Sequence, residues 1–185
     1  MSNISKYLNA CRDRYLLRLS DAVESARLDG TLVDWEVARV NDSDEVVKVG
    51  CPPTGLRVDL LLEIDGSFQP VRVMPETVQD LVPLNHRFVG GLEIFARCSR
   101  WDAMQVRVVS PHMVVKEIGA WFDLWFKEED ESEVFPRLCV HYMSDVQARE
   151  RVFSFDVDLG TAPIIALEGL FESLAEAGGQ KVFLY

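Results

Sequence analysis

The stretch that decides the fold is residues 152–185, VFSFDVDLGTAPIIALEGLFESLAEAGGQKVFLY. Its first part alternates apolar and polar side chains as far as Leu159, which is typical of a half-buried strand. Apolar residues then recur at spacings of three and four over 162–177, which predicts an amphipathic helix. Gly178-Gly179 ends that helix, and residues 181–185 predict a last strand. We therefore expect a C-terminal β-α-β unit whose two strands run parallel if they share one sheet.

Upstream of this unit the chain indicates mostly antiparallel sheet. Asp65-Gly66 stands between two apolar runs, 56–64 and 68–74, and this arrangement predicts a hairpin. Pro70 in the second run indicates an edge strand, because proline cannot donate to a sheet ladder. The other strand-like segments are 35–40, 46–49, 88–97, 104–109 and 138–143. We expect 88–97 and 104–109 to form a strand pair around residues 99–102.

Two further helices complete the expected elements. Residues 4–28 carry a long apolar stripe that ends at Asp29-Gly30, and Ser110-Pro111 is a typical start for a helix over 111–127. The predicted class is α+β: a mostly antiparallel sheet with three main helices packed on it and the β-α-β end. A length of 185 residues fits a single α+β domain over 1–185, in which helix 4–28 could be peripheral.

The helix at 111–127 is the most unusual element, because two tryptophans and two phenylalanines fall within six residues. Such a stripe predicts burial in the core, and the alternative is a ligand pocket beneath the helix. Trp121 and Trp125 would line that pocket together with Cys139 and His141.

Residues 156–161, DVDLGT, raise the question of phosphate chemistry. The segment resembles the Asp-x-Asp-Gly-Thr sequence of haloacid-dehalogenase phosphatases, and Asp158 to Thr161 resembles the Asp-Leu-Gly-Thr sequence of actin-like ATPases. Either resemblance implies aspartates at a magnesium and phosphate site. Both families need far more chain after the motif than the residues that follow Thr161 here. We interpret Asp156 and Asp158 as the solvated face of a strand, with Asp158 and Thr161 at helix N-cap positions.

Cys139 and His141 are the second candidate for chemistry. Strand alternation would place both on one face, where they could form a nucleophile and base pair or two metal ligands. The simpler interpretation is a core thiol beside a surface imidazole. No ligand spacing joins the other histidines to them, so we expect no catalytic residue, metal or cofactor. The four cysteines are widely spaced and read as reduced thiols of a cytoplasmic protein.

The composition limits the class of partner. The net charge is -11, which disfavours nucleic acid and anionic membrane surfaces as partners. No apolar run is long enough to cross a bilayer, and the first twenty residues do not resemble a secretion signal. The usual role of the densest acidic run is solubility, and the functional alternative is a docking surface for a basic protein, since complementary charge steers association. The run consists of Glu128, Glu129, Asp130, Glu131 and Glu133.

We therefore expect a non-enzymatic, cytoplasmic and bacterial protein-binding module that acts stoichiometrically on a basic protein partner. Immunity proteins paired with toxins, and type III secretion chaperones, share this acidity and size, which is an analogy of composition. The alternative is a small-molecule-binding protein or enzyme with a pocket under helix 111–127. A structural homo-oligomer is a third possibility.

Overall fold

The computed structural model describes residues 3–38, 48–49, 54–73, 82–87, 89–98, 100–112, 114–126 and 135–185. Its elements in chain order are α1 (Asn3–Leu28), β1 (Leu32–Ala38), β2 (Lys48–Val49), β3 (Thr54–Gly55), β4 (Arg57–Ile64), β5 (Ser67–Val71), β6 (Leu84–Arg87), the 3-10 turn η1 (Val89–Gly91), β7 (Glu93–Ala96), β8 (Met104–Val109), α2 (Val115–Phe126), β9 (Tyr142–Met143), β10 (Gln147–Arg149), β11 (Val152–Asp158), α3 (Ile164–Glu176) and β12 (Lys181–Leu184). The predicted α+β class is confirmed. No helix among these described residues is long and apolar enough to cross a membrane.

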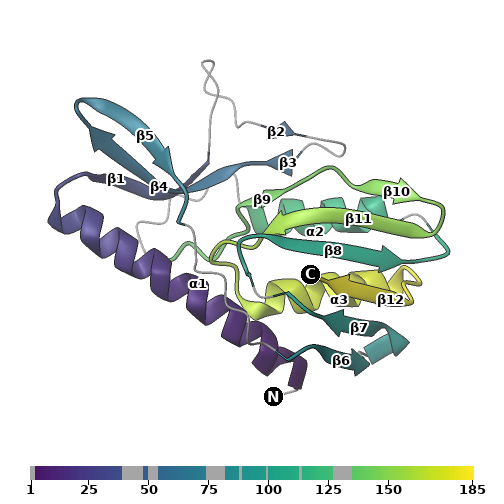
Figure 1. The fold of residues 1–185 in the computed structure, drawn as a ribbon. Coiled ribbons are helices and arrows are strands. Elements are labelled where there is room, and N and C mark those ends of the chain that lie inside the picture. Colours follow the sequence, from purple (N-terminus) through teal and green to yellow (C-terminus); the bar gives the residue numbers. More distant parts are fainter. Residues whose placement is uncertain are drawn as a thin grey trace.

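The strands form a large sheet, a small sheet and a two-stranded β2-β3 pair (Figure 1). The large sheet has the order β10-β11-β8-β12-β7-β6, with β9 also paired to β11, and the small sheet has the order β1-β4-β5. Every pairing is antiparallel except that of β12 with β7. Pro70 lies on β5 at the edge of the small sheet, as predicted.

The C-terminal β-α-β unit is confirmed in an expanded form. β11 and β12 both pair antiparallel with β8, which lies between them, so they run parallel to each other in one sheet. The insertion of β12 corrects the expected pairing of 88–97 with 104–109. β12 separates β7 from β8 and bonds to both, because its apolar side chains complete the buried face of the sheet.

Several element boundaries differ from the sequence prediction. The predicted strand 138–143 is confined to Tyr142–Met143. The segment before it divides its backbone bonds among β11, β1 and the end of α2, and therefore forms no continuous ladder. Helix α2 begins at Val115, four residues after the predicted start. Residues 84–87 form β6, a strand that the sequence pattern did not predict.

One hydrophobic core joins the helices to the sheets. α2 and α3 lie behind the large sheet in Figure 1 and cover the face that carries Val106, Phe155 and Val182. Helix α1 spans both sheets, and its buried stripe of Leu8, Cys11, Tyr15 and Leu19 belongs to the same core. The N-terminal helix is therefore an integral part of the packing.

Candidate functional site

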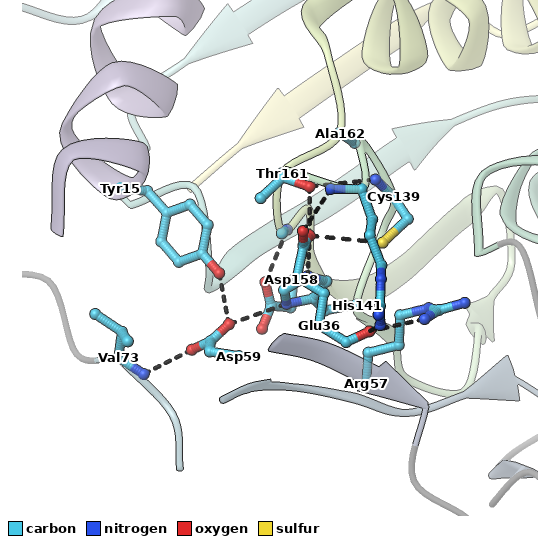
Figure 2. A network of polar contacts seen from close by, with 12 residues as sticks. Tyr15, Glu36, Arg57, Asp59, Val73, Cys139, His141, Asp158, Thr161 and Ala162 are labelled. Carbon is cyan, nitrogen blue, oxygen red and sulfur yellow. Dashed lines mark hydrogen bonds and ion pairs between the residues drawn. The ribbon is translucent and has the colours of Figure 1, made fainter. Parts of the chain in front are cut away.

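A buried polar centre lies where the small sheet meets the large one (Figure 2). His141 is at its middle: Nε2 lies 2.9 Å from Glu36 Oε1, and Nδ1 lies 3.0 Å from Asp59 Oδ1. The contact with Asp59 is an ion pair whose angles depart from those of a hydrogen bond. The three residues are exposed by 0% (Glu36), 2% (Asp59) and 0% (His141), so charged groups here have no access to bulk water.

Backbone hydrogen bonds to two strands hold His141 in place. The His141 N–H donates to the Asp158 carbonyl on β11 over 2.9 Å, and the His141 carbonyl accepts from the Arg57 N–H on β4 over 2.7 Å. Glu36 lies between the register pairs Trp35↔Leu60 and Val37↔Val58, which places it level with Asp59 on the neighbouring strand. The centre is therefore the seam that joins the two sheets.

Glu36 adopts a positive φ of 51°, a left-handed conformation that side chains other than glycine rarely take. Its carboxylate is fully engaged there. Oε1 accepts hydrogen bonds from the Thr161 hydroxyl and, over 3.6 Å, from the Cys139 thiol, and Oε2 accepts from the Arg137 N–H over 2.6 Å. Contacts with several neighbours hold the strained residue in place.

Asp59 is anchored from the opposite side of His141. Its Oδ1 accepts a hydrogen bond of 2.5 Å from the Tyr15 hydroxyl on α1, and its Oδ2 accepts one of 2.6 Å from the Val73 N–H. Figure 2 shows both donors approaching from the side away from Glu36. Helix α1 thus contributes directly to the centre.

Arg57 ties the centre to the aromatic helix. Its side chain is 2% exposed; Nε donates to the Phe126 carbonyl over 2.9 Å and Nη1 to the Glu36 carbonyl over 2.7 Å. The guanidinium also stacks 5.0 Å from the Phe126 ring centroid. A cation at the last carbonyl of α2 compensates the negative end of the helix dipole.

The electrostatics of the centre favour a charged imidazole. Burial alone lowers the pKa of His141, but the contacts with Asp59, Cys139 and Glu36 outweigh it and raise the pKa well above its ordinary value. Burial also acts to raise the pKa of Glu36 and Asp59, and the interactions with His141 reverse it, so both pKa values are lowered. The centre is an imidazolium held between two carboxylates.

Asp158 corrects the interpretation of DVDLGT. Asp156 is exposed, as predicted for a solvated strand face, whereas Asp158 is only 4% exposed. Oδ1 of Asp158 accepts from the Gly160 N–H over 2.9 Å, and Oδ2 lies 3.8 Å from Arg72 Nη2. Burial raises the pKa of Asp158 to about 7, against the opposing charge of His141.

The predicted N-caps are also wrong. Helix α3 begins at Ile164, its N-cap is Pro163, and no side chain caps it. The Thr161 hydroxyl donates to Glu36 instead. The alternation fails at the end of β11 because residues 157–162 are all buried, through the turn at Gly160, whose φ is positive.

The same correction applies to His141, which is a buried imidazole and not a surface one. Cys139 is buried as predicted, and both side chains contact Glu36. Of the predicted pocket residues, Trp121 is buried and its indole N–H donates to the Ala166 carbonyl over 2.6 Å, while Trp125 is half-buried. The Val140 N–H donates to the Trp125 carbonyl over 2.9 Å, which places residues 139–141 beside the end of α2.

The centre contains two overlapping groups of possible metal ligands. Glu36, Cys139 and His141 form one, and Asp59, His141 and Asp158 form the other; the ligand atoms of each group lie within 4.8 Å of one another. The first set has the nitrogen, sulfur and oxygen donors that suit zinc. Among the described residues each group offers three ligands, whereas a closed zinc site uses four. A metal would also have to displace the proton that His141 shares with its carboxylates.

Sequence reasoning missed Glu36, Arg57, Asp59 and Tyr15. The available signal was a charge inside an apolar strand: Arg57 and Asp59 alternate within the run from Leu56 to Ile64. Glu36 gave no signal, because it follows the alternation of β1 and reads as a solvated residue. The acidic run from Glu128 to Glu133 lies outside the described residues.

Comparisons with protein-family models, with curated proteins and with solved structures found no match to this chain.

Proposed function

We propose that the protein is a non-enzymatic module that binds a protein partner stoichiometrically in the cytoplasm. The observation that carries this proposal is the contrast between its buried and its exposed polar groups. The groups suited to acid-base or nucleophilic chemistry are closed inside the fold, where Glu36, Cys139 and His141 are each 0% exposed. In the part of the chain that the structure describes, these side chains present no exposed surface to a substrate.

The charge distribution supports a basic partner. Segments 39–47, 74–81 and 127–134 carry ten carboxylates and two cations, a net -8, so only -3 of the total -11 belongs to the described residues. Concentrated negative charge steers a positively charged surface into contact and raises the association rate. The five acidic residues between Glu128 and Glu133 form the densest of these segments. An immunity-like or chaperone-like role fits this distribution by analogy of composition.

An enzyme or small-molecule binder is the second candidate, because Cys139 and His141 do converge, on Glu36. An enzyme or small-molecule binder of this kind requires a path for the substrate or ligand beneath α2. Trp121 fills the space against α3, and Arg57 closes the end of the helix. The binding module therefore accounts better for the described structure.

The experiment is an affinity capture at low salt from the native host, followed by native mass spectrometry of the purified complex. We expect a complex of fixed stoichiometry that weakens as salt is raised. Replacement of the five acidic residues at 128–133 by Gln and Asn should weaken it by at least about tenfold. The matched control neutralises five exposed carboxylates on the helices: Asp13, Asp21, Glu24, Glu172 and Glu176. Failure to capture any partner, or an equal effect of the two sets, would contradict the proposal.

A further inference from the structure

The large sheet has a second face that no helix covers among the described residues. Its side chains alternate with the buried ones, so the register identifies them. One row across the strands is Gln147, Ser154, Arg107, Phe183, Phe95 and Asn85, and the next is Arg149, Val152, Val109, Lys181, Glu93 and Arg87. We call these two rows, together with Gln105, Asp156 and Tyr185, the open face.

A stack of aromatic rings occupies the middle of the open face. The rings of Phe95 and Phe183 lie 4.8 Å apart at 14°, and those of Phe183 and Tyr185 lie 6.3 Å apart at 8°. Cations close both ends: Lys181 lies 5.9 Å from the Phe95 centroid and Arg107 lies 5.2 Å from that of Tyr185. The flat sides of the rings therefore contact one another and the cations, and the ring edges remain for a partner.

The open face carries positive charge on an acidic protein. It holds Arg87, Arg107, Arg149 and Lys181 against Glu93 and Asp156, a net +2 where the chain carries -11. Glu93 is shared by Arg87 and Lys181, each at 3.5 Å. Among the described residues Arg149 has no ion pair, and Arg107 bonds only to neutral groups, Gln105 and the Tyr185 ring. The two arginines at one end of the face, Arg107 and Arg149, can therefore bind carboxylates of a partner.

Hollows lie at both ends of the aromatic stack. The larger, of about 580 Å³, is lined by Arg107, Gln147, Arg149, Glu150, Val152 and Ser154. The smaller, of about 280 Å³, is lined by Asn85, His86, Arg87, Glu93 and Phe95. The larger hollow has two arginines against one carboxylate, Glu150, whereas in the smaller one Arg87 is paired with Glu93. The larger hollow therefore suits a segment that presents both carboxylates and apolar groups.

We propose that the open face is a docking surface for an acidic segment of a partner protein, an inference that rests on the proposed function. It is separate from the acidic run at 128–133, which would contact a basic region. Charge complementarity favours an acidic occupant. Single-stranded nucleic acid, the other acidic class, binds by stacking bases on free aromatic faces. Here the ring faces are already in contact with one another, so a protein segment fits better.

The test uses a labelled short peptide of mixed glutamate and leucine, with fluorescence anisotropy on the full-length chain. The wild type should bind this peptide. Neither the lysine-leucine counterpart nor a single-stranded oligothymidylate should bind more tightly than the glutamate-leucine peptide does. The double variant Arg107→Glu with Arg149→Glu should weaken binding by roughly tenfold or more. Tyr185→Ala, at an exposed side chain, should weaken it with no effect on folding.

The matched control is Lys6→Glu with Lys116→Glu, which makes the same charge change on exposed helical positions and should leave binding within about twofold. Equal losses in the two double variants, preference for the oligothymidylate, or no peptide binding would overturn the inference. If the complex with the captured native partner survives the Arg107 and Arg149 changes but not neutralisation of 128–133, the inference fails and the proposed function stands. If the peptide binds with the expected charge preference but no native partner is captured, the proposed function fails and the docking surface stands.

Discussion

His141 keeps its charge inside the protein because Glu36 and Asp59 flank it on opposite sides. Each of these ions is costly to bury alone, and the three together are stable only while each keeps its partner. Asp158 is a further buried carboxylate of the centre, and its own ion pair is with Arg72, a half-exposed side chain whose Nη2 lies 3.8 Å from Oδ2. Burial raises the pKa of Asp158, and the negative charge of Asp59 adds to this, while His141 and Arg72 oppose it.

The first prediction concerns the pH dependence of Asp158. Because its pKa rises from 3.8 to about 7 on folding, the folded state binds the proton more tightly. Its stabilising contribution is therefore complete below the unfolded pKa and is lost as the pH rises through about 7. The free energy of unfolding should fall over this range, by at most about 1.4 kcal/mol per pH unit from this one proton. Urea denaturation at several pH values measures it.

Two comparisons isolate that effect. Asp158→Asn mimics the protonated acid and should flatten the decline, whereas Asp156→Asn, at an exposed position, should leave it unchanged. The stabilising contribution of His141 is also lost as the pH rises, but only at higher pH, because its folded pKa lies well above the ordinary value. Glu36 and Asp59 have lowered pKa values, so their contributions are lost at acid pH, below the window for Asp158. An unchanged slope in Asp158→Asn would refute the assignment.

The second prediction concerns Gly160, which packs against the imidazole. It has φ +50°, and a Cβ there would lie 2.2 Å from His141 Cδ2. Gly160→Ala should therefore destabilise the fold by more than about 1 kcal/mol, through strain and through displacement of His141. Gly169→Ala is the control: it lies within α3 with nothing within 4 Å of the added atom. It should stabilise by about 0.5–1 kcal/mol, and thermal unfolding compares the two.

At the scale of elements, the small sheet is fixed to the large one through few direct strand contacts. The isolated bridge Leu56↔Tyr142 and the backbone bonds of Arg57 and His141 join them. The side chains of the polar centre supply the rest of the attachment, together with Tyr15 from α1. Removal of the central cation should therefore loosen the small sheet first.

The third prediction tests this with hydrogen exchange. His141→Gln leaves two buried carboxylates without their cation and should cost about 3–5 kcal/mol of stability. Amide protection should fall more in β4 and β5 than in β8, β12 and α3, because the latter pack in the hydrophobic core. His112→Gln, at an exposed position, should change neither quantity. Uniform loss of protection across both sheets would contradict a local role for the centre.

At the scale of the whole molecule, the described residues share one hydrophobic core that includes α1, α2, α3 and both sheets. The single domain 1–185 remains a prediction, and it has a direct test. Unfolding in urea should give one transition, with the same midpoint by far-UV circular dichroism and by tryptophan fluorescence. Trp101 and Trp121 report on the large-sheet side and Trp35 on the small sheet, so separate midpoints would reveal two units.

The sequence could predict those features that depend on local periodicity. Helices α1 and α3, the hairpin at Asp65-Gly66 and the edge position of Pro70 follow from spacing, turn residues and the missing N–H of proline. Burial of the aromatic face of α2 follows from its apolar stripe. These features need only neighbours within a few residues, and the local pattern therefore determined them.

Only the tertiary structure decided where β12 inserts and what the charged residues of the strands do. Glu36, Asp59, His141 and Asp158 come from four separate segments, and in sequence each resembles a solvated residue beside an apolar one. Their ionic contacts form only after long-range packing has excluded water and brought opposite charges together. Local periodicity records which face a side chain lies on, but the identity of the facing element depends on the assembly of the whole chain.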